Sequence, residues 1–117
     1  MSLKILHIDD DERVCQVTGR MLTHCGHIVT TFLTAAEALD HFDAQMYDLV
    51  ITDNEMPEMT GLTLCHAILE RNPHQRILMI SGGTIRPAGL PEAVLYMSKP
   101  VRLAELRDTL VDIEEMA

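Results

Sequence analysis

Five residues spread along this sequence carry the side chains that phosphoryl transfer requires: Asp9, Asp10, Asp53, Ser81 and Lys99. Carboxylates that cluster repel one another, and they either take up a proton or bind a cation. Mg²⁺ suits such a cluster because it typically takes one or two protein carboxylates while keeping waters and phosphate oxygens. A carboxylate nucleophile, a metal ion, an ammonium group and a hydroxyl donor together suit phosphoryl transfer, provided that the fold brings them together.

Apolar, strand-like runs alternate along the chain with segments of helical periodicity. This alternation indicates a parallel sheet covered on both faces, and short right-handed connections leave few topologies. We therefore predict an α/β fold, a flavodoxin-like (CheY-like) doubly wound sheet of five parallel strands in the order 2-1-3-4-5. The strand-like runs are LKILHI (3–8), HIVTTF (27–32), DLVIT (48–52), RILMI (76–80) and VLYM (94–97).

The helical segments follow from apolar residues three or four positions apart and from capping signals. Thr34, with Glu37 three residues later, forms a capping box that predicts the start of the second helix. The residues expected to face inward are Val14, Val17, Met21 and Cys25 in the first helix, Ala35, Ala38, Leu39 and Phe42 in the second, Leu62, Cys65, Ile68 and Leu69 in the third, and Leu103, Leu106, Leu110 and Ile113 in the last.

The predicted strand order brings the polar residues to one edge of the sheet. Strands one and three are neighbours in this order, and ligands of open parallel sheets bind outside the carboxyl ends of the strands where the order reverses. Asp9 and Asp10 follow strand one and Asp53 follows strand three, while Ser81 and Lys99 follow strands four and five. The sequence therefore predicts three carboxylates in one shallow cleft, bordered by a hydroxyl and an ammonium group.

Simpler roles are open to some of these residues. Asp9, Asp10 and Asp11 can cap the first helix and interact favourably with its dipole, and Asp11 is expected to act only as a cap. Ser81 precedes Gly82-Gly83, which is also ordinary loop chemistry.

The motifs around these residues resemble those of the receiver domain of two-component response regulators, over essentially the whole chain. The matching pieces, in chain order, are ILHIDDDE, DLVITDNEMPEMTGL, ILMIS and MSKP. The resemblance implies a single receiver domain over 1–117, a switching module rather than an enzyme. Such a domain takes a phosphoryl group from a sensor histidine kinase or a histidine phosphotransfer protein and controls a downstream output domain or protein.

The resemblance also implies the acceptor and the metal ligands. Asp53 matches the phosphoacceptor, which also binds Mg²⁺. Asp10 matches a direct Mg²⁺ ligand and Asp9 a ligand that acts through water. Glu55 is expected to contribute its backbone carbonyl to the same ion.

Further roles follow for residues at the ends of strands four and five. Ser81 stands where the family keeps a hydroxyl residue that moves toward the phosphoryl group, and Lys99 matches the residue that pairs with the phosphoryl oxygens. The peptide before Pro100 is typically cis in this family. Tyr96 stands where an aromatic switch residue is common, and packing in a partly buried position would explain it equally well.

The chain departs from the family between Ser81 and Lys99, where it is several residues shorter than usual. The stretch GGTIRPAGLPEA (82–93) contains three glycines and two prolines, which disfavour a helix. The helix usual at this place is therefore predicted to be shortened or missing, and the usual output surface would change with it.

The overall composition narrows the remaining possibilities. Eighteen acidic residues against nine basic ones give a net charge of −9, which argues against direct nucleic-acid binding. The three cysteines form no C-x-x-C pair and fit a reduced cytoplasm. No apolar run approaches the ~20 residues of a transmembrane helix, so no membrane insertion is expected.

Two alternative functions would each require a sequence feature that can be looked for in this chain. A Mg²⁺-dependent phosphohydrolase with an aspartate nucleophile carries a D-x-D-x-[TV] pattern after its first strand, and DDDER (9–13) lacks the final residue. A flavin-binding protein of flavodoxin type needs a phosphate loop after strand one, where three aspartates would repel the phosphate.

Overall fold

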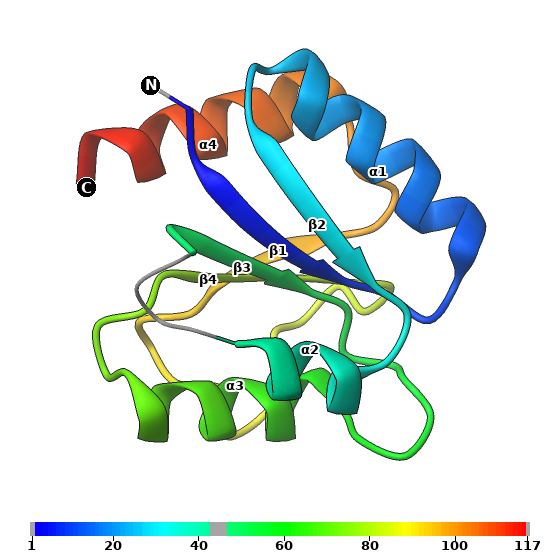
Figure 1. The fold of residues 1–117 in the computed structure, drawn as a ribbon, viewed down its shortest axis with the longest axis vertical. Helices are drawn as coiled ribbons and strands as arrows, with labels where there is room; N and C mark the ends of the chain where they lie inside the picture. Colours follow the sequence, from blue (N-terminus) through cyan, green and yellow to red (C-terminus); the bar gives the residue numbers. More distant parts are fainter. Residues whose placement is uncertain (1, 43–46, 117) are drawn as a thin grey trace.

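The computed structural model describes residues 2–42 and 47–116; Met1 and Ala117, the ends of the expected domain, lie outside this part. Five parallel strands form one sheet in the order β2-β1-β3-β4-β5 (Figure 1), which confirms the predicted topology. The strands are β1 (Lys4–Ile8), β2 (Ile28–Phe32), β3 (Leu49–Thr52), β4 (Ile77–Ser81) and β5 (Leu95–Ser98).

Helices cover the sheet on both faces. Helices α1 (Glu12–His24) and α4 (Leu103–Met116) lie on one face, and α2 (Ala35–His41) and α3 (Gly61–Arg71) lie on the other (Figure 1). A separate cluster of buried apolar side chains fills the space on each side of the sheet. Strands β3 and β4 are buried along their whole length, as expected for apolar runs in a parallel sheet. No helix among the described residues is long and apolar enough to cross a membrane.

Three helices begin at the side chains that the sequence suggests. Asp11 caps α1, Thr34 caps α2 and Thr60 caps α3, and each side-chain oxygen accepts a hydrogen bond from a backbone amide two or three residues later. These caps satisfy amides that have no partner inside the helix. The expectation that Asp11 serves as a cap is confirmed.

The inward face predicted for α1 is confirmed only at its C-terminal end, where the partly buried Met21 and Cys25 pack against the apolar cluster. The buried residues of this helix are Cys15, Thr18 and Leu22, whereas Val17 is 53% exposed. Helix α1 packs over β1 and β2 at one side of the sheet, and this position turns Val14 and Val17 toward a groove that residues 99–101 line on its other side. A wholly apolar stripe therefore does not by itself identify the buried face.

The connection between β4 and β5 contains no helix, as the sequence predicts. Leu90 and Val94 are buried and join the apolar cluster on the α2 and α3 side. The guanidinium of Arg86 donates hydrogen bonds to the carbonyl oxygens of Val94 at 2.7 Å and Pro91 at 2.6 Å. The connection is thus a compact loop cross-linked by one arginine.

Candidate functional site

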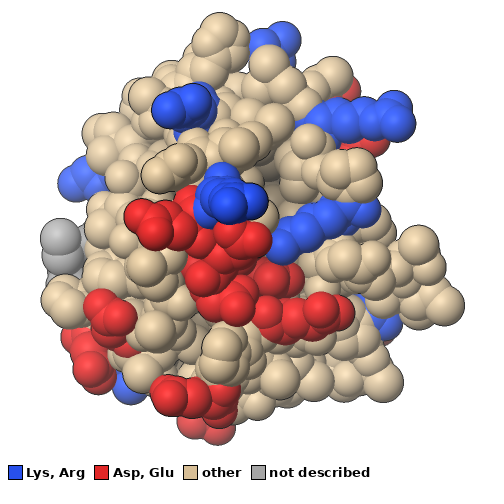
Figure 2. Space-filling model, turned by 90° about the vertical axis from the view of Figure 1, so that its right-hand side faces the viewer, with Lys and Arg blue, Asp and Glu red and all other residues tan. Residues whose placement is uncertain are grey.

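Three carboxylates converge at the carboxyl ends of neighbouring strands. Because Ile8 and Thr52 are register partners in β1 and β3, the residues that follow them lie side by side. One carboxylate oxygen each of Asp9, Asp10 and Asp53 lies within 4.8 Å of the others. Figure 2 views the side of the molecule toward which the strands point, and acidic side chains gather there in one patch beside basic ones.

The two buried carboxylates are held by backbone amides. Asp9 is 2% exposed and Asp53 is 7% exposed. Oδ1 of Asp9 accepts a hydrogen bond from the Asp11 amide at 2.9 Å, and Oδ1 of Asp53 accepts one from the Asn54 amide at 2.8 Å. These contacts orient both side chains through Oδ1 and leave Oδ2 of each free to contact another group.

Lys99 connects the two remaining oxygens. Its Nζ lies 3.2 Å from Oδ2 of Asp9 and 3.2 Å from Oδ2 of Asp53. Burial of the ammonium opposes its charge, but the hydrogen bonds and charges of the two aspartates outweigh this effect and raise the pKa of Lys99. The backbone amide of Lys99 donates to the Ser81 carbonyl at 2.7 Å, and the Lys99–Pro100 peptide is cis.

The donor set fits a hard divalent cation. Three carboxylates face one ammonium group, so that two negative charges remain uncompensated when all are ionised. Oxygen ligands in this number and charge match Mg²⁺ rather than a softer metal. The Glu55 carboxylate is not among the converging groups; this residue lies in the loop after Asp53, and its amide points toward Asp53 Oδ1 at 3.4 Å.

The start of α3 holds the loop that carries Asp53. Oδ1 of Asn54 accepts from the Leu62 amide at 3.0 Å, and the Asn54 carbonyl accepts from the Gly61 amide at 2.9 Å. A Cβ atom added to Gly61 would lie 2.1 Å from the carbonyl oxygen of Asp53. The loop is therefore packed directly against the helix, and only glycine fits at the contact.

Ser81 and Tyr96 lie at the β4–β5 side of the cleft. Ser81 is buried at the end of β4. The hydroxyl of Tyr96 donates to the carbonyl oxygen of Gly83, which also accepts a hydrogen bond from Ser98 Oγ at 2.9 Å. The Tyr96 ring packs against the apolar cluster on the α2 and α3 face of the sheet. This residue therefore combines a packing position with a hydrogen bond to Gly83, two residues beyond Ser81.

His7 is a site neighbour that the sequence reasoning missed. Its side chain is 3% exposed, and its Nδ1 has no hydrogen-bond partner among the described residues. It lines a groove of about 520 Å³ between α1 and residues 99–101, together with Asp9, Asp53 and Lys99. The available signal was its place as the one histidine in the apolar run LKILHI, two residues before Asp9.

We expect His7 to make the protein acid-sensitive. Burial lowers the pKa of His7 from 6.5 to about 4, so that the unfolded chain takes up a proton that the folded chain refuses. Above pH 6.5 His7 is neutral in both states, and the free energy of unfolding has its full value. As the pH falls from 6.5 toward 4, the unfolded chain is protonated at His7 first, and the free energy of unfolding decreases. The linked loss of unfolding free energy is on the order of 3 kcal/mol over this window.

Urea unfolding of the wild type and of His7→Leu in EDTA, at intervals from pH 8 to 4, measures this loss. The difference between the two curves removes the contribution of titrating carboxylates that both proteins share. If the free energy of unfolding of the two proteins changes in parallel with pH over the whole range, His7 does not cause the acid sensitivity.

The chain matches the model of the response regulator receiver domain family over residues 5–111. It is 36% identical over 111 residues to the two-component response regulator ORR26 of Oryza sativa subsp. japonica, covering 91% of this chain and 19% of the relative. It is 31% identical over 117 residues to the response regulator receiver protein CpdR of Brucella abortus, covering 97% of this chain and 95% of CpdR.

A solved structure shares the fold closely. The response regulator protein TrrA of Thermotoga maritima, in complex with Mg²⁺ and BeF, superposes with a TM-score of 0.88 at 27% identity, and covers 97% of this chain and 99% of TrrA. The first plant relatives are much longer, because this chain spans 19% of one and 16% of the next.

Proposed function

This chain belongs to the response regulator receiver domain family of two-component systems, and we propose that Asp53 is its phosphoacceptor. The phosphoryl group would come from the phosphohistidine of a sensor histidine kinase or a histidine phosphotransfer protein. One observation carries this proposal: Asp53 follows a buried strand and its Oδ2 contacts Lys99 beside two further carboxylates.

The transfer follows from the position of Asp53. A carboxylate oxygen of Asp53 attacks the phosphorus atom, the bond between phosphorus and the imidazole nitrogen breaks, and an acyl phosphate forms on Asp53. The histidine of the donor leaves as a neutral imidazole once that nitrogen carries the bonding electron pair and the other retains its proton. Hydrogen bonding of Asp53 Oδ1 to the Asn54 amide fixes the side chain so that little orientation is lost in the reaction.

The charged groups around Asp53 are placed to interact with the transferred phosphoryl group. Asp10, Asp53 and the Glu55 carbonyl would bind Mg²⁺ directly, with Asp9 acting through water, and Mg²⁺ held there would supply positive charge to the phosphoryl oxygens. Lys99 exchanges its contact with Asp53 for the new phosphoryl oxygens. Because Asp9 also contacts Lys99, the ammonium stays in place while Asp53 changes its charge.

The output signal is proposed to pass through residues 82–93. When Ser81 moves toward the phosphoryl group it pulls on Gly83, whose carbonyl is held by Tyr96 and Ser98. The same loop presents Ile85, which is 82% exposed. A downstream domain or protein would then read this loop, because the chain has no helix between β4 and β5 to offer it.

Beryllofluoride, a phosphoryl mimic, tests the site and the switch in one experiment on the isotopically labelled chain. With Mg²⁺ and beryllofluoride we expect amide resonances to move at residues 9–11 and 53–55, at Gly83 and at Tyr96. Mg²⁺ with fluoride alone should move only the residues near the metal, and EDTA should reverse every change. Unchanged resonances at 53–55 with all components present would refute Asp53 as the acceptor.

Three broader features of the function are proposed from the family match, the net charge and the cysteines. The match to a signalling family supports a switch rather than a phosphohydrolase that turns over external substrates. The net charge of −9 supports partners other than nucleic acid. Cys15, Cys25 and Cys65 are free thiols, which supports a reducing compartment such as the cytoplasm.

A further inference from the structure

Strand β2 forms an open edge of the sheet. Among the described residues it pairs with β1 alone. Alternate residues bond toward that side: the Ile28 amide donates to the Leu3 carbonyl, and the Phe32 carbonyl accepts from the Asp9 amide. In a parallel pair the intervening residues direct their amide and carbonyl groups to the opposite side. Val29, Thr31 and Leu33 therefore present unpaired backbone donors and acceptors along the free edge.

This edge lacks the usual protection against pairing. Natural edge strands are commonly interrupted by charged residues, proline or bulges, but the segment IVTTFL (28–33) contains none of these residue types. Ile28 is 58% exposed and Leu33 is 43% exposed. The segment is thus a β-forming, uncharged surface with free hydrogen-bonding groups.

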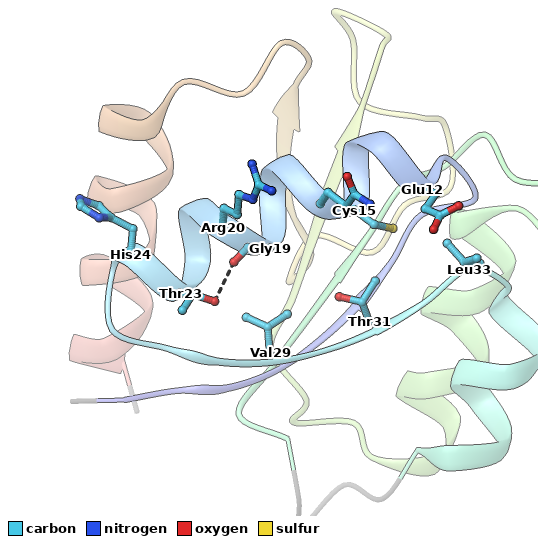
Figure 3. A pocket seen from close by; sticks show the side chains of 10 residues that line it. Glu12, Cys15, Gly19, Arg20, Thr23, His24, Val29, Thr31 and Leu33 are labelled. Carbon is cyan, nitrogen blue, oxygen red and sulfur yellow. Dashed lines mark hydrogen bonds between the residues drawn. The ribbon is translucent and has the colours of Figure 1, made fainter.

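Helix α1 runs beside this edge and forms a groove with it. The groove has a volume of about 710 Å³, and Figure 3 shows Val29, Thr31 and Leu33 as its strand side. On the helix side Glu12 lies at the Leu33 end and Arg20 lies toward the Val29 end (Figure 3). The two ends of the groove therefore carry opposite charges.

We propose that the occupant of this edge is a second copy of the chain, paired through β2 in antiparallel orientation about a two-fold axis perpendicular to the sheet. The pairing would place Thr31 opposite Thr31 of the partner subunit and Val29 opposite Leu33 of the partner subunit. Each of these pairs then exchanges amide and carbonyl hydrogen bonds, as alternate pairs do in an antiparallel ladder. The apolar Val29 and Leu33 side chains meet across the strands on the α1 face.

The charges on α1 select this arrangement. A two-fold axis perpendicular to the sheet keeps both α1 helices on the same face and makes them antiparallel. Glu12 then faces Arg20 of the partner subunit, and the reciprocal pair forms at the other end of the groove. Gly19 leaves open space, since a Cβ atom there would have no heavy atom within 4 Å, which lets the two helices approach. An extended acidic or basic peptide would match only one end of the groove.

Sedimentation equilibrium of the chain against Thr31→Pro and Thr31→Val tests the pairing. Proline removes the outward amide of residue 31 without removing a bond to β1, whereas valine keeps that amide and the β-branched shape. We expect a monomer–dimer equilibrium for the wild type and Thr31→Val, and a monomer for Thr31→Pro. A wild type that stays monomeric up to about 1 mM, the weak end of measurable affinity, or a dimeric Thr31→Pro would overturn the proposal.

Charge reversal gives a second test that does not alter the strand. Glu12→Arg and Arg20→Glu should each raise the dimer dissociation constant about tenfold, since each reversal turns two attractive pairs into repulsive ones. The double variant should restore the wild-type constant. Additive losses in the double variant would exclude the Glu12–Arg20 pairing.

Disulfide trapping reports the register. Residues in a hydrogen-bonded antiparallel pair have Cα atoms about 5.5 Å apart, within disulfide reach. Thr31→Cys should therefore cross-link on mild oxidation, whereas Leu33→Cys should not, because its symmetry mate lies four residues away along the ladder. The wild type under the same oxidant controls for Cys15, Cys25 and Cys65, and cross-linking through Leu33→Cys alone would refute this register.

Discussion

Asp53→Asn is expected to gain no phosphoryl group when the chain is incubated with Mg²⁺ and acetyl phosphate, whereas the wild type gains one. The asparagine amide is not a nucleophile at neutral pH, while its oxygen can still accept the Asn54 amide that now bonds Asp53 Oδ1. Labelling should fall by more than about a thousandfold, the scale on which enzymes lose rate with their nucleophile. Intact-mass spectrometry over a time course measures the adduct.

Asp11→Asn is the matched control for this prediction. It removes a carboxylate from the same acidic run, but Asp11 caps α1, and asparagine caps a helix about equally well. We expect it to be labelled at nearly the wild-type rate. Labelling of Asp53→Asn as fast as the control would show that another residue is the acceptor.

Gly61→Ala is expected to lower the free energy of unfolding by about 3 kcal/mol, the upper range for overpacking a tightly packed site. The added Cβ would lie 2.1 Å from the carbonyl oxygen of Asp53 and 2.8 Å from Cα of Asn54. Both atoms belong to the backbone, so that no side-chain rotation can relieve the clash. The loop carrying Asp53 must shift, and phosphorylation by acetyl phosphate should slow as well.

Gly19→Ala is the same substitution in open space. Nothing lies within 4 Å of a Cβ atom at this helical position, and alanine is about 1 kcal/mol more favourable than glycine inside a helix. We expect Gly19→Ala to raise the free energy of unfolding, measured with urea at a dilution that keeps the chain monomeric. Equal effects of the two substitutions would contradict the close contact at Gly61.

The sheet and its polar edge were predictable because they depend on patterns local in the chain. Apolar runs of strand length, separated by helical segments, define the parallel sheet, and the preferred strand order brings Asp9 and Asp53 to neighbouring strand ends. The caps at Asp11, Thr34 and Thr60 follow from the preference of short polar side chains for helix starts. The loss of the helix between β4 and β5 follows equally from the glycines and prolines of 82–93.

The remaining features depend on contacts between residues far apart in the sequence. Which face of α1 is buried depends on where that helix sits over β1 and β2, and two stripes of this helix are apolar enough to serve. The pKa of His7 depends on its burial beside the groove that α1 forms with residues 99–101. The bridge from Lys99 to both Asp9 and Asp53 depends on how the end of β5 lies relative to the ends of β1 and β3.

Residue types and spacings thus determined which kind of ligand this protein could bind and at which end of the strands the binding side chains would lie. Packing of the elements against one another decided which charges are buried together and which side chains stay exposed along the edge strand β2. Hydrophobic periodicity is a local, one-dimensional signal, whereas burial, charge coupling and close backbone contact arise only when distant segments share the same space.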